Sequence, residues 1–411
     1  MYILADLLAL LIIARVFGEL AERLGQPASA GEILAGITLV SAAAWFGQSL
    51  PFLDQLIASD ALETAAQIGI FFLLLVAGIE IEPKEVAENS AVSFAVAFGG
   101  MIVPLLGGFS LAWLFLPESD LKAVQALLIG IALSISAIPA MVKMLSELGL
   151  LHTRMGEILI SAAIVDDVMG LFLLAVLLSM MENGTFPDMA TLALMVAKVT
   201  AFFAITVTLG VHVYPRVSRA IKAMQAAAIE FSAITIVALA YGLLAELLGM
   251  HWILGAFMAG LYFEKTRVGR REYNEIVLIC GALTRGVLGP LFFVSIGLQV
   301  DLSAVTAVPV FLFLLIAVAF LGKLLGAGIP ALLGGLHRRE AAIVGIGMSA
   351  RGAVELVLLS IALESGIFSQ AGQKDPIVTH LFSSLVIVGV ITTLLVPIIM
   401  RRVQQRINRH A

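Results

Sequence analysis

Apolar residues in this chain run in long stretches separated by short clusters of charged residues, glycine and proline. A helix needs about 20 apolar residues to cross the roughly 30 Å hydrocarbon core of a bilayer. We therefore predict an all-α membrane protein with about thirteen transmembrane helices, allowing the ninth to be short. The expected spans are residues 2–20, 30–48, 61–80, 90–116, 123–147, 155–181, 189–213, 224–248, 251–263, 284–304, 306–334, 338–364 and 377–400.

Composition supports this class and excludes others. Of the 411 residues, 61% are hydrophobic and 13% are charged, which is far from the mix of a soluble domain. The net charge of −5 and the lack of a basic aromatic tract give no reason to expect a nucleic-acid partner. A single cysteine, Cys280, excludes an intrachain disulfide and a cysteine-based metal cluster. No nucleophile–base motif or phosphate loop occurs, so we expect neither an enzyme nor a bound cofactor.

Lysine and arginine concentrate in alternate loops and in the basic tail that begins at Arg401. Loops rich in these residues stay in the cytoplasm. The C-terminus is therefore expected inside. An odd number of spans then places the N-terminus outside.

Three short patterns recur in the same order about 220 positions later in the chain, which is typical of an internal repeat. An offset of seven spans inverts the second copy in the membrane. We expect inverted repeats at about 2–181 and 224–400, joined by a linker helix at about 189–213, the architecture of a secondary transporter. The matching stretches begin at Gly25 and Gly249, at Leu75 and Val294, and at Ile129 and Val344.

The third matching pair falls on the two least regular spans. Pro139 lies in the middle of the fifth span, after Ser134 and Ser136, and three glycines surround Arg351 in the twelfth. Broken helices at matching positions of two inverted halves indicate an ion site, because free carbonyls and helix ends face one another there. The alternative is a pair of ordinary kinks, which are common in membrane helices.

Two adjacent acids, Asp166 and Asp167, lie near the middle of the sixth span. Each costs roughly 2.5–3.5 kcal/mol at that depth and should face protein or water. Their side chains point about 100° apart around a helix, which favours two separate roles over a shared one. Lys323 is equally deep in its span, and either acid is a candidate partner for its ammonium. A purely structural polar pair is the alternative interpretation.

These residues suggest a mechanism. A buried carboxylate holds a proton until a cation or a lysine replaces it. An alkali cation prefers oxygen ligands, and a carboxylate with serine hydroxyls and freed carbonyls would suit it. Exchange of a monovalent cation for protons follows if one carboxylate binds either ion. A sodium-coupled carrier of organic anions is an alternative, whereas a buried acid–lysine pair disfavours a channel.

The chain resembles the second family of bacterial cation–proton antiporters, which holds sodium/proton exchangers and Kef-type potassium/proton antiporters. The resemblance spans nearly the whole chain. It rests on Gly31-Glu-Ile-Leu-Ala-Gly36, Ala77-Gly78-Ile-Glu80, Ser134-Ile-Ser-Ala-Ile-Pro139, Ala163-Ile-Val-Asp166-Asp167, Phe292-Phe-Val-Ser-Ile-Gly297, Gly322-Lys323 and Gly347-Met-Ser-Ala-Arg351-Gly352.

This resemblance implies a homodimer in a bacterial inner membrane. Core helices at about 61–181 and 284–400 would slide, like an elevator, against a dimerisation part at about 2–48 and 224–263. It also implies that Asp167 binds Na⁺ and that Asp166 pairs with Lys323. Two acids resemble the electrogenic branch, which exchanges more than one proton per cation.

The choice between Na⁺ and K⁺ stays open, since the chain departs from many relatives at Ser136 and Ala137. Arg351 and Glu355 stand four residues apart. They could support the broken helix, or they could simply neutralise one another on one helix face.

Overall fold

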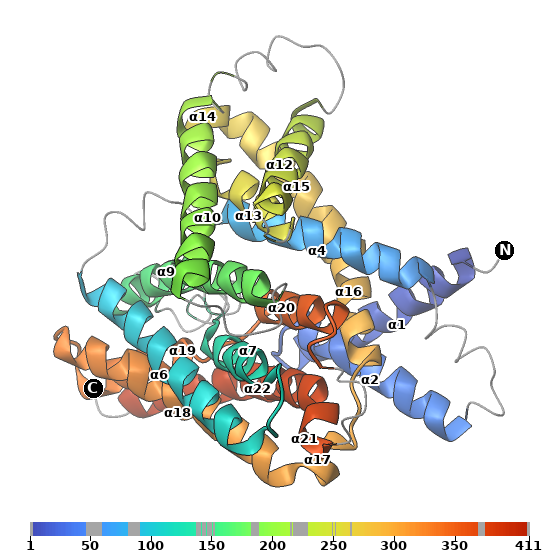
Figure 1. Ribbon diagram of the computed structural model, residues 1–411, viewed down its shortest axis with the longest axis vertical. Helices are drawn as coiled ribbons and strands as arrows, with labels where there is room; N and C mark the ends of the chain where they lie inside the picture. The colour runs from blue at the N-terminus through green and yellow to red at the C-terminus, as the bar shows by residue number, and fades with distance from the viewer. Residues whose placement is uncertain are drawn as a thin grey trace.

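The computed structural model describes residues 3–46, 60–80, 91–136, 141, 145, 150, 153–181, 189–213, 216, 229–248, 250, 252–263, 265–368 and 375–408. Every regular element among these residues is helical, which confirms the all-α class (Figure 1). The helices of the first half are α1 (Ile3–Arg23), α2 (Ala28–Phe46), α4 (Asp60–Glu80), α6 (Ala91–Phe115), α7 (Lys122–Ser134), α9 (Arg154–Met181), α10 (Met189–Thr208) and η1 (Leu209–Val213).

The second half begins at α12. Its helices are α12 (Ile229–Leu247), α13 (Ile253–Leu261), α14 (Lys265–Val268), α15 (Arg270–Leu283), η2 (Thr284–Leu288), α16 (Gly289–Leu298), α17 (Ala304–Ala307), α18 (Pro309–Leu333), α19 (Arg338–Gly347), α20 (Ala353–Glu364), α21 (Pro376–Thr379) and α22 (Leu381–Asn408). Six helices in the described part of the chain are long and apolar enough to span a membrane. The count of thirteen spans stays a prediction.

The helix ends follow local chemistry. Proline starts α18 at Pro309, where its missing N–H costs nothing, and Gly335 ends the turn after this helix with a positive φ of 90°. The backbone N–H of His337 donates to the Glu340 carboxylate at 2.9 Å, which caps the start of α19.

The tenth span starts earlier than the sequence predicts. The structure runs one continuous helix from Arg270 to Leu298 through the π-helical turn η2, whereas the sequence analysis expects this span to begin at 284. Four charged residues lie in the first turns of α15 and lower its mean hydropathy. A span predicted from apolar residues alone therefore begins too late in the chain. The charged first turns of this helix can lie outside the hydrocarbon core while its apolar remainder crosses it.

The helices pack as two groups. The scaffold group is α1, α2, α4, α12, α13, α15 and α16, and the broken-helix group is α6, α7, α9, α18, α19, α20 and α22. The groups meet where α4 touches α20 and α2 touches α22, and α10 runs between α9 and the α12–α13 pair (Figure 1). This packing places α4 in contact with α13, and α16 in contact with α1 and α2. The division into core and dimerisation parts, with residues 61–181 and 284–400 in the core, stays a prediction.

Two glycine crossings hold the scaffold group together. A Cβ on Gly36 would lie 2.3 Å from the Val294 carbonyl oxygen of α16, and one on Gly260 would lie 2.2 Å from the Leu75 oxygen of α4. The contacts at the first crossing involve Gly297 and those at the second involve Gly78. These four glycines occupy matching positions of the sequence repeat. The α2–α16 crossing therefore has its counterpart in the α13–α4 crossing, with the two halves of the chain exchanged.

Substitution at such a crossing should be costly. We expect Gly260→Ala to destabilise the protein by about 1–3 kcal/mol, because its methyl group must push two backbones apart. Gly286→Ala is the matched control, since an added Cβ there meets no atom within 4 Å. Thermal unfolding in detergent measures the difference, and equal melting of the two variants would contradict the crossing argument.

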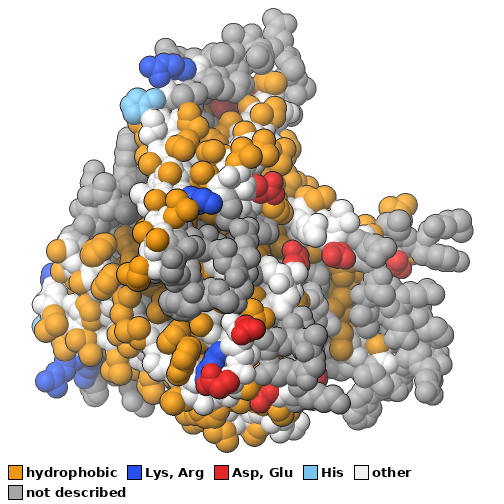
Figure 2. Space-filling view, viewed as in Figure 1, with side chains coloured by type: hydrophobic (Ala, Val, Ile, Leu, Met, Phe, Trp, Pro, Cys, Tyr) orange, Lys and Arg blue, Asp and Glu red, His pale blue; other side chains and the backbone are white. Residues whose placement is uncertain are grey.

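Polarity is distributed as expected for a bilayer solvent. Large apolar side chains of α6, α10 and α18 are exposed, including Phe98, Leu194 and Phe313. Figure 2 shows them covering much of the visible face along α10 and α6. Charged side chains such as Lys323 and Arg351 are instead buried. Buried charge inside an apolar exterior points to an interior ionic site.

Candidate ion site at the crossing of the broken helices

The site is organised by α9, which passes both helix breaks. A Cβ on Gly347, at the end of α19, would lie 2.7 Å from Leu159 of α9. Further along α9, a Cβ on Gly170 would lie 3.2 Å from Ile135, the residue at which α7 ends. Asp166 and Asp167 lie between these two contact points on α9. The helix therefore carries both acids past the crossing.

Both predicted breaks begin where the sequence patterns place them. Helix α7 ends at Ser134, and Ile135 is extended at φ −71° and ψ 141°. Helix α19 ends at Gly347 and α20 starts at Ala353, after Gly352 with extended backbone. Pro139 lies outside the described residues. These interruptions leave carbonyls at the C-terminal ends of α7 and α19 without partners in their own helices.

Side chains from the opposite break bind those carbonyls. The Ser136 hydroxyl donates to the Met348 carbonyl oxygen at 2.7 Å, and Arg351 Nη2 donates to the Leu133 oxygen at 2.7 Å. The repeat aligns Leu133 with Met348 and Ser136 with Arg351, so the two bonds are reciprocal. The caps differ in charge, because one is a hydroxyl and the other a guanidinium.

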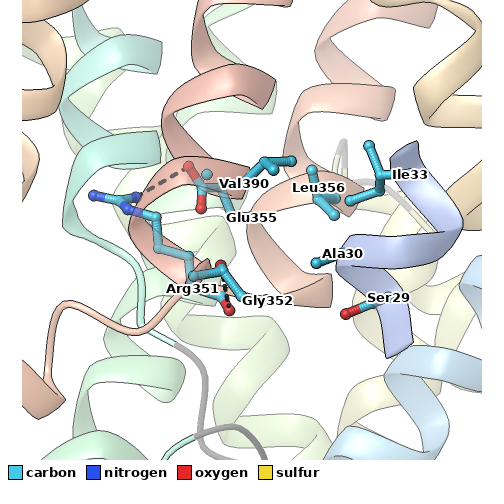
Figure 3. Close-up of a pocket in the computed structure, with 10 residues that line it drawn as sticks. Ser29, Ala30, Ile33, Arg351, Gly352, Glu355, Leu356 and Val390 are labelled. Atoms are coloured by element: carbon cyan, nitrogen blue, oxygen red, sulfur yellow. Dashed lines mark hydrogen bonds and ion pairs between the residues drawn. The ribbon is translucent and has the colours of Figure 1, made fainter. Parts of the chain in front are cut away.

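Arg351 is the hub of this crossing. Its Nη1 also donates to the Ala132 carbonyl and, at 3.0 Å, to Glu355 Oε1 of α20 (Figure 3). Both side chains are 1% exposed. Thr393 of α22 donates its hydroxyl to the Arg351 carbonyl at 3.2 Å. A cation at the C-terminal end of α7 stabilises the negative end of its dipole. The arginine therefore bridges α7 and α20. It does more than neutralise Glu355 on one helix face.

A second buried ion pair joins α9 to α18. Lys323 Nζ lies 2.9 Å from Asp166 Oδ2 and 3.1 Å from Oδ1, with both side chains at or below 1% exposure. Of the two acids considered from sequence, the structure brings Asp166 to the lysine. Removing one partner of such a pair leaves a buried charge and typically costs 3–5 kcal/mol.

The remaining predicted residues are distributed around the crossing. Asp167 follows Asp166 on α9, and its side chain lies outside what the structure describes, so Na⁺ binding there stays a prediction. The Ser134 hydroxyl is buried and donates to the Ile131 oxygen at 2.8 Å. Ser134 and Ser136 each use their proton on a carbonyl, which leaves oxygen lone pairs able to accept.

Comparison with known proteins identifies the family of this chain. The profile of the transmembrane sodium/hydrogen exchangers matches residues 7–403. The chain belongs to the sodium/hydrogen exchanger family. This confirms, at the level of the family, the resemblance drawn from the sequence motifs. The family is one of membrane transporters.

Individual relatives cover nearly the whole of this exchanger-family chain. The Na⁺/H⁺-K⁺ antiporter GerN of Bacillus cereus is 29% identical over 94% of this chain and 92% of its own. The Na⁺/H⁺ antiporter of Enterococcus hirae is 28% identical over 96% of both. The solved sodium proton antiporter MjNhaP1 of Methanocaldococcus jannaschii shares the fold, with a TM-score of 0.73 at 18% identity over 97% of this chain and 96% of its own.

The sequence analysis did not predict two groups that form hydrogen bonds at this site. The Met348 carbonyl and the Thr393 hydroxyl both take part in the crossing network. A main-chain carbonyl carries no sequence signal, although the break predicted around it does. Thr393 is one of several hydroxyl residues in an apolar span, and only its contact with Arg351 distinguishes it.

Proposed function

We propose that this chain is a secondary active antiporter that exchanges a monovalent cation, Na⁺ in the first place, for protons. The observation that carries the proposal is the buried Asp166–Lys323 pair, next to a second acid on the helix that passes both breaks. Asp167 would bind the cation or a proton in turn. The relatives' names, with Na⁺ and H⁺ as the exchanged ions, support the same assignment.

The ion pair suggests how more than one proton is exchanged per cation. Asp166 is charged when paired with Lys323, and breaking the pair allows a proton to bind the acid. Cation binding at Asp167 would be coupled to the making and breaking of this pair. Electrogenic exchange follows if two protons move against one cation.

The two helix groups suggest the motion. Among the described residues, contacts between them include those of α2 with α22 and of α4 with α20. In our proposal the broken-helix group, which carries the ion pair, slides against the scaffold group in an elevator-type alternating access. The scaffold group would form a homodimer in a bacterial inner membrane, with the N-terminus outside and the C-terminus in the cytoplasm.

A potassium/proton antiporter is the second candidate, because the relative GerN is named a Na⁺/H⁺-K⁺ antiporter. A sodium-coupled carrier of organic anions is less well supported. It would need a cationic contact for the anion, and both Lys323 and Arg351 are paired with carboxylates.

A cation panel in proteoliposomes tests the proposal. A pH-sensitive dye reports an inward proton gradient, and Na⁺, Li⁺, K⁺ and choline are added in turn. We expect Na⁺ and Li⁺ to dissipate the gradient, with choline as the inert control. A response to K⁺ alone would favour the second candidate, and no response to any cation would contradict antiport. Applying a membrane potential then tests electrogenicity, because only net charge movement responds to it.

A further inference from the structure

A small cavity lies on the boundary between the two helix groups. Its volume is about 20 Å³, enough for a water molecule or a single small ion. Glu355 faces it from α20, and Figure 3 shows Ala30 and Ile33 of α2 on the opposite side. Its other lining residues are Ser29 of α2, Arg351, Gly352 and Leu356 of the break and α20, and Gly389, Val390 and Thr393 of α22.

Glu355 has an unused oxygen at this cavity. Its Oε1 accepts from Arg351, whereas Oε2 is buried and has no hydrogen-bond partner among the described residues. A Cβ on Gly389 would lie 3.4 Å from that Oε2, so the oxygen is turned toward α22. A buried carboxylate oxygen without a donor is costly and is expected to take up a proton or a water.

The surroundings favour a proton over a metal cation. The charged groups acting on Glu355 are Arg351, at 3.0 Å, and Lys323 of α18. The cavity residues from α2 and α22 are all uncharged. Among the residues described at the cavity, Glu355 supplies the only carboxylate, so a metal cation would lack a second charged ligand, whereas a proton needs only one acceptor oxygen.

We propose that Glu355 is an additional proton-binding residue, which exchanges its proton through the cavity between α2 and the α20–α22 pair. This inference rests on the proposed antiport function, which it deepens. Protonation of Glu355 removes its charge pairing with Arg351 and leaves the guanidinium to the α7 carbonyls. The proton on Glu355 is thereby coupled to the helix crossing at the ion site. Sliding at the α2 boundary would open and close the route to water.

Infrared spectroscopy of the purified protein tests this assignment without any transport assay. A protonated buried carboxyl gives a carbonyl band distinct from that of a carboxylate, and we expect such a band to titrate in the wild type. One component of this band should be missing in Glu355→Gln and present in Glu364→Gln, which removes an exposed acid from the same helix, while any components from Asp166 and Asp167 remain in both variants. A titrating band that is unchanged in Glu355→Gln would overturn the proposal.

Transport provides the second readout. Glu355→Gln should shift the pH of half-maximal exchange by about one unit or more, or make exchange insensitive to pH, while Glu364→Gln follows the wild type. Identical pH profiles for the wild type and Glu355→Gln would count against the inference. If the wild type exchanges no cation, the antiport proposal fails, and the infrared titration still decides whether Glu355 binds a proton.

Gly389→Ala covers the case in which Glu355→Gln does not fold. Its methyl group would lie 3.4 Å from Glu355 Oε2, an ordinary contact, and it keeps every charge while occupying the cavity. We expect the carboxyl band to persist with a shifted titration midpoint, because the methyl group displaces water from the carboxylate. An unshifted midpoint in this variant would contradict proton exchange through the cavity.

Discussion

Replacing Asp167 with asparagine abolishes cation-dependent proton exchange in our expectation and leaves a folded protein. Asparagine has nearly the same size and fits the same position on α9, but it can neither carry the negative charge nor bind the exchanged proton. The Asp166–Lys323 pair on the same helix stays intact, so the free energy of unfolding should change little. Dye-reported exchange in proteoliposomes should fall to the level of protein-free liposomes.

Asp166→Asn is the matched control for this experiment, because it neutralises the neighbouring acid of the same helix. We expect it to retain exchange with fewer protons per cation and a lower melting temperature, since it removes the carboxylate seen at Lys323. Normal exchange by Asp167→Asn would show that the cation binds elsewhere. Loss of exchange in Asp166→Asn alone would assign the cation to the paired acid.

Lys323→Ala should lower the free energy of unfolding by about 3–5 kcal/mol, because it leaves the Asp166 carboxylate buried without its ammonium partner. The expected signs are a lower melting temperature in detergent and reduced, pH-shifted exchange. Lys122→Ala is the control lysine. Its side chain is only 8% exposed, but its partner Glu118 is 89% exposed and keeps its hydration when the ammonium is removed, so we expect a smaller loss than at Lys323.

A double substitution separates charge from packing. Asp166→Leu with Lys323→Leu removes both charges at once, and apolar replacement of a whole buried pair is often neutral for stability. We expect the double variant to melt above Lys323→Ala while its exchange no longer shows the wild-type pH dependence. If Lys323→Ala melts like the wild type, the pair does not contribute to folding as proposed.

Depth in the membrane explains why the ion pair could be anticipated from sequence. Lys323 lies in the middle of an apolar span, so its ammonium must find an acid, and few acids lie equally deep. Which of Asp166 and Asp167 it meets depends on the rotation of α9 against α18, a tertiary property. Hydropathy cannot fix that rotation, because both residues belong to the same apolar stretch.

The network around Arg351 shows the limit of local reasoning. The spacing of Arg351 and Glu355 predicts their pairing, and the structure contains it. The bonds from Arg351 to the carbonyls of Ala132 and Leu133 join residues more than two hundred positions apart. They follow only once the inverted repeat is placed in space, where each break meets the other.

The unequal caps at that meeting point have a directional consequence. In an inverted-repeat transporter, the inward-open and outward-open states are related by the two halves exchanging conformations. Two serine caps would make the states nearly equal in electrostatic energy, whereas Ser136 on one end and the Arg351 guanidinium on the other make them unequal. In our proposal the two states would therefore differ in energy before any gradient or voltage is applied, and the Arg351 guanidinium would contribute to that difference.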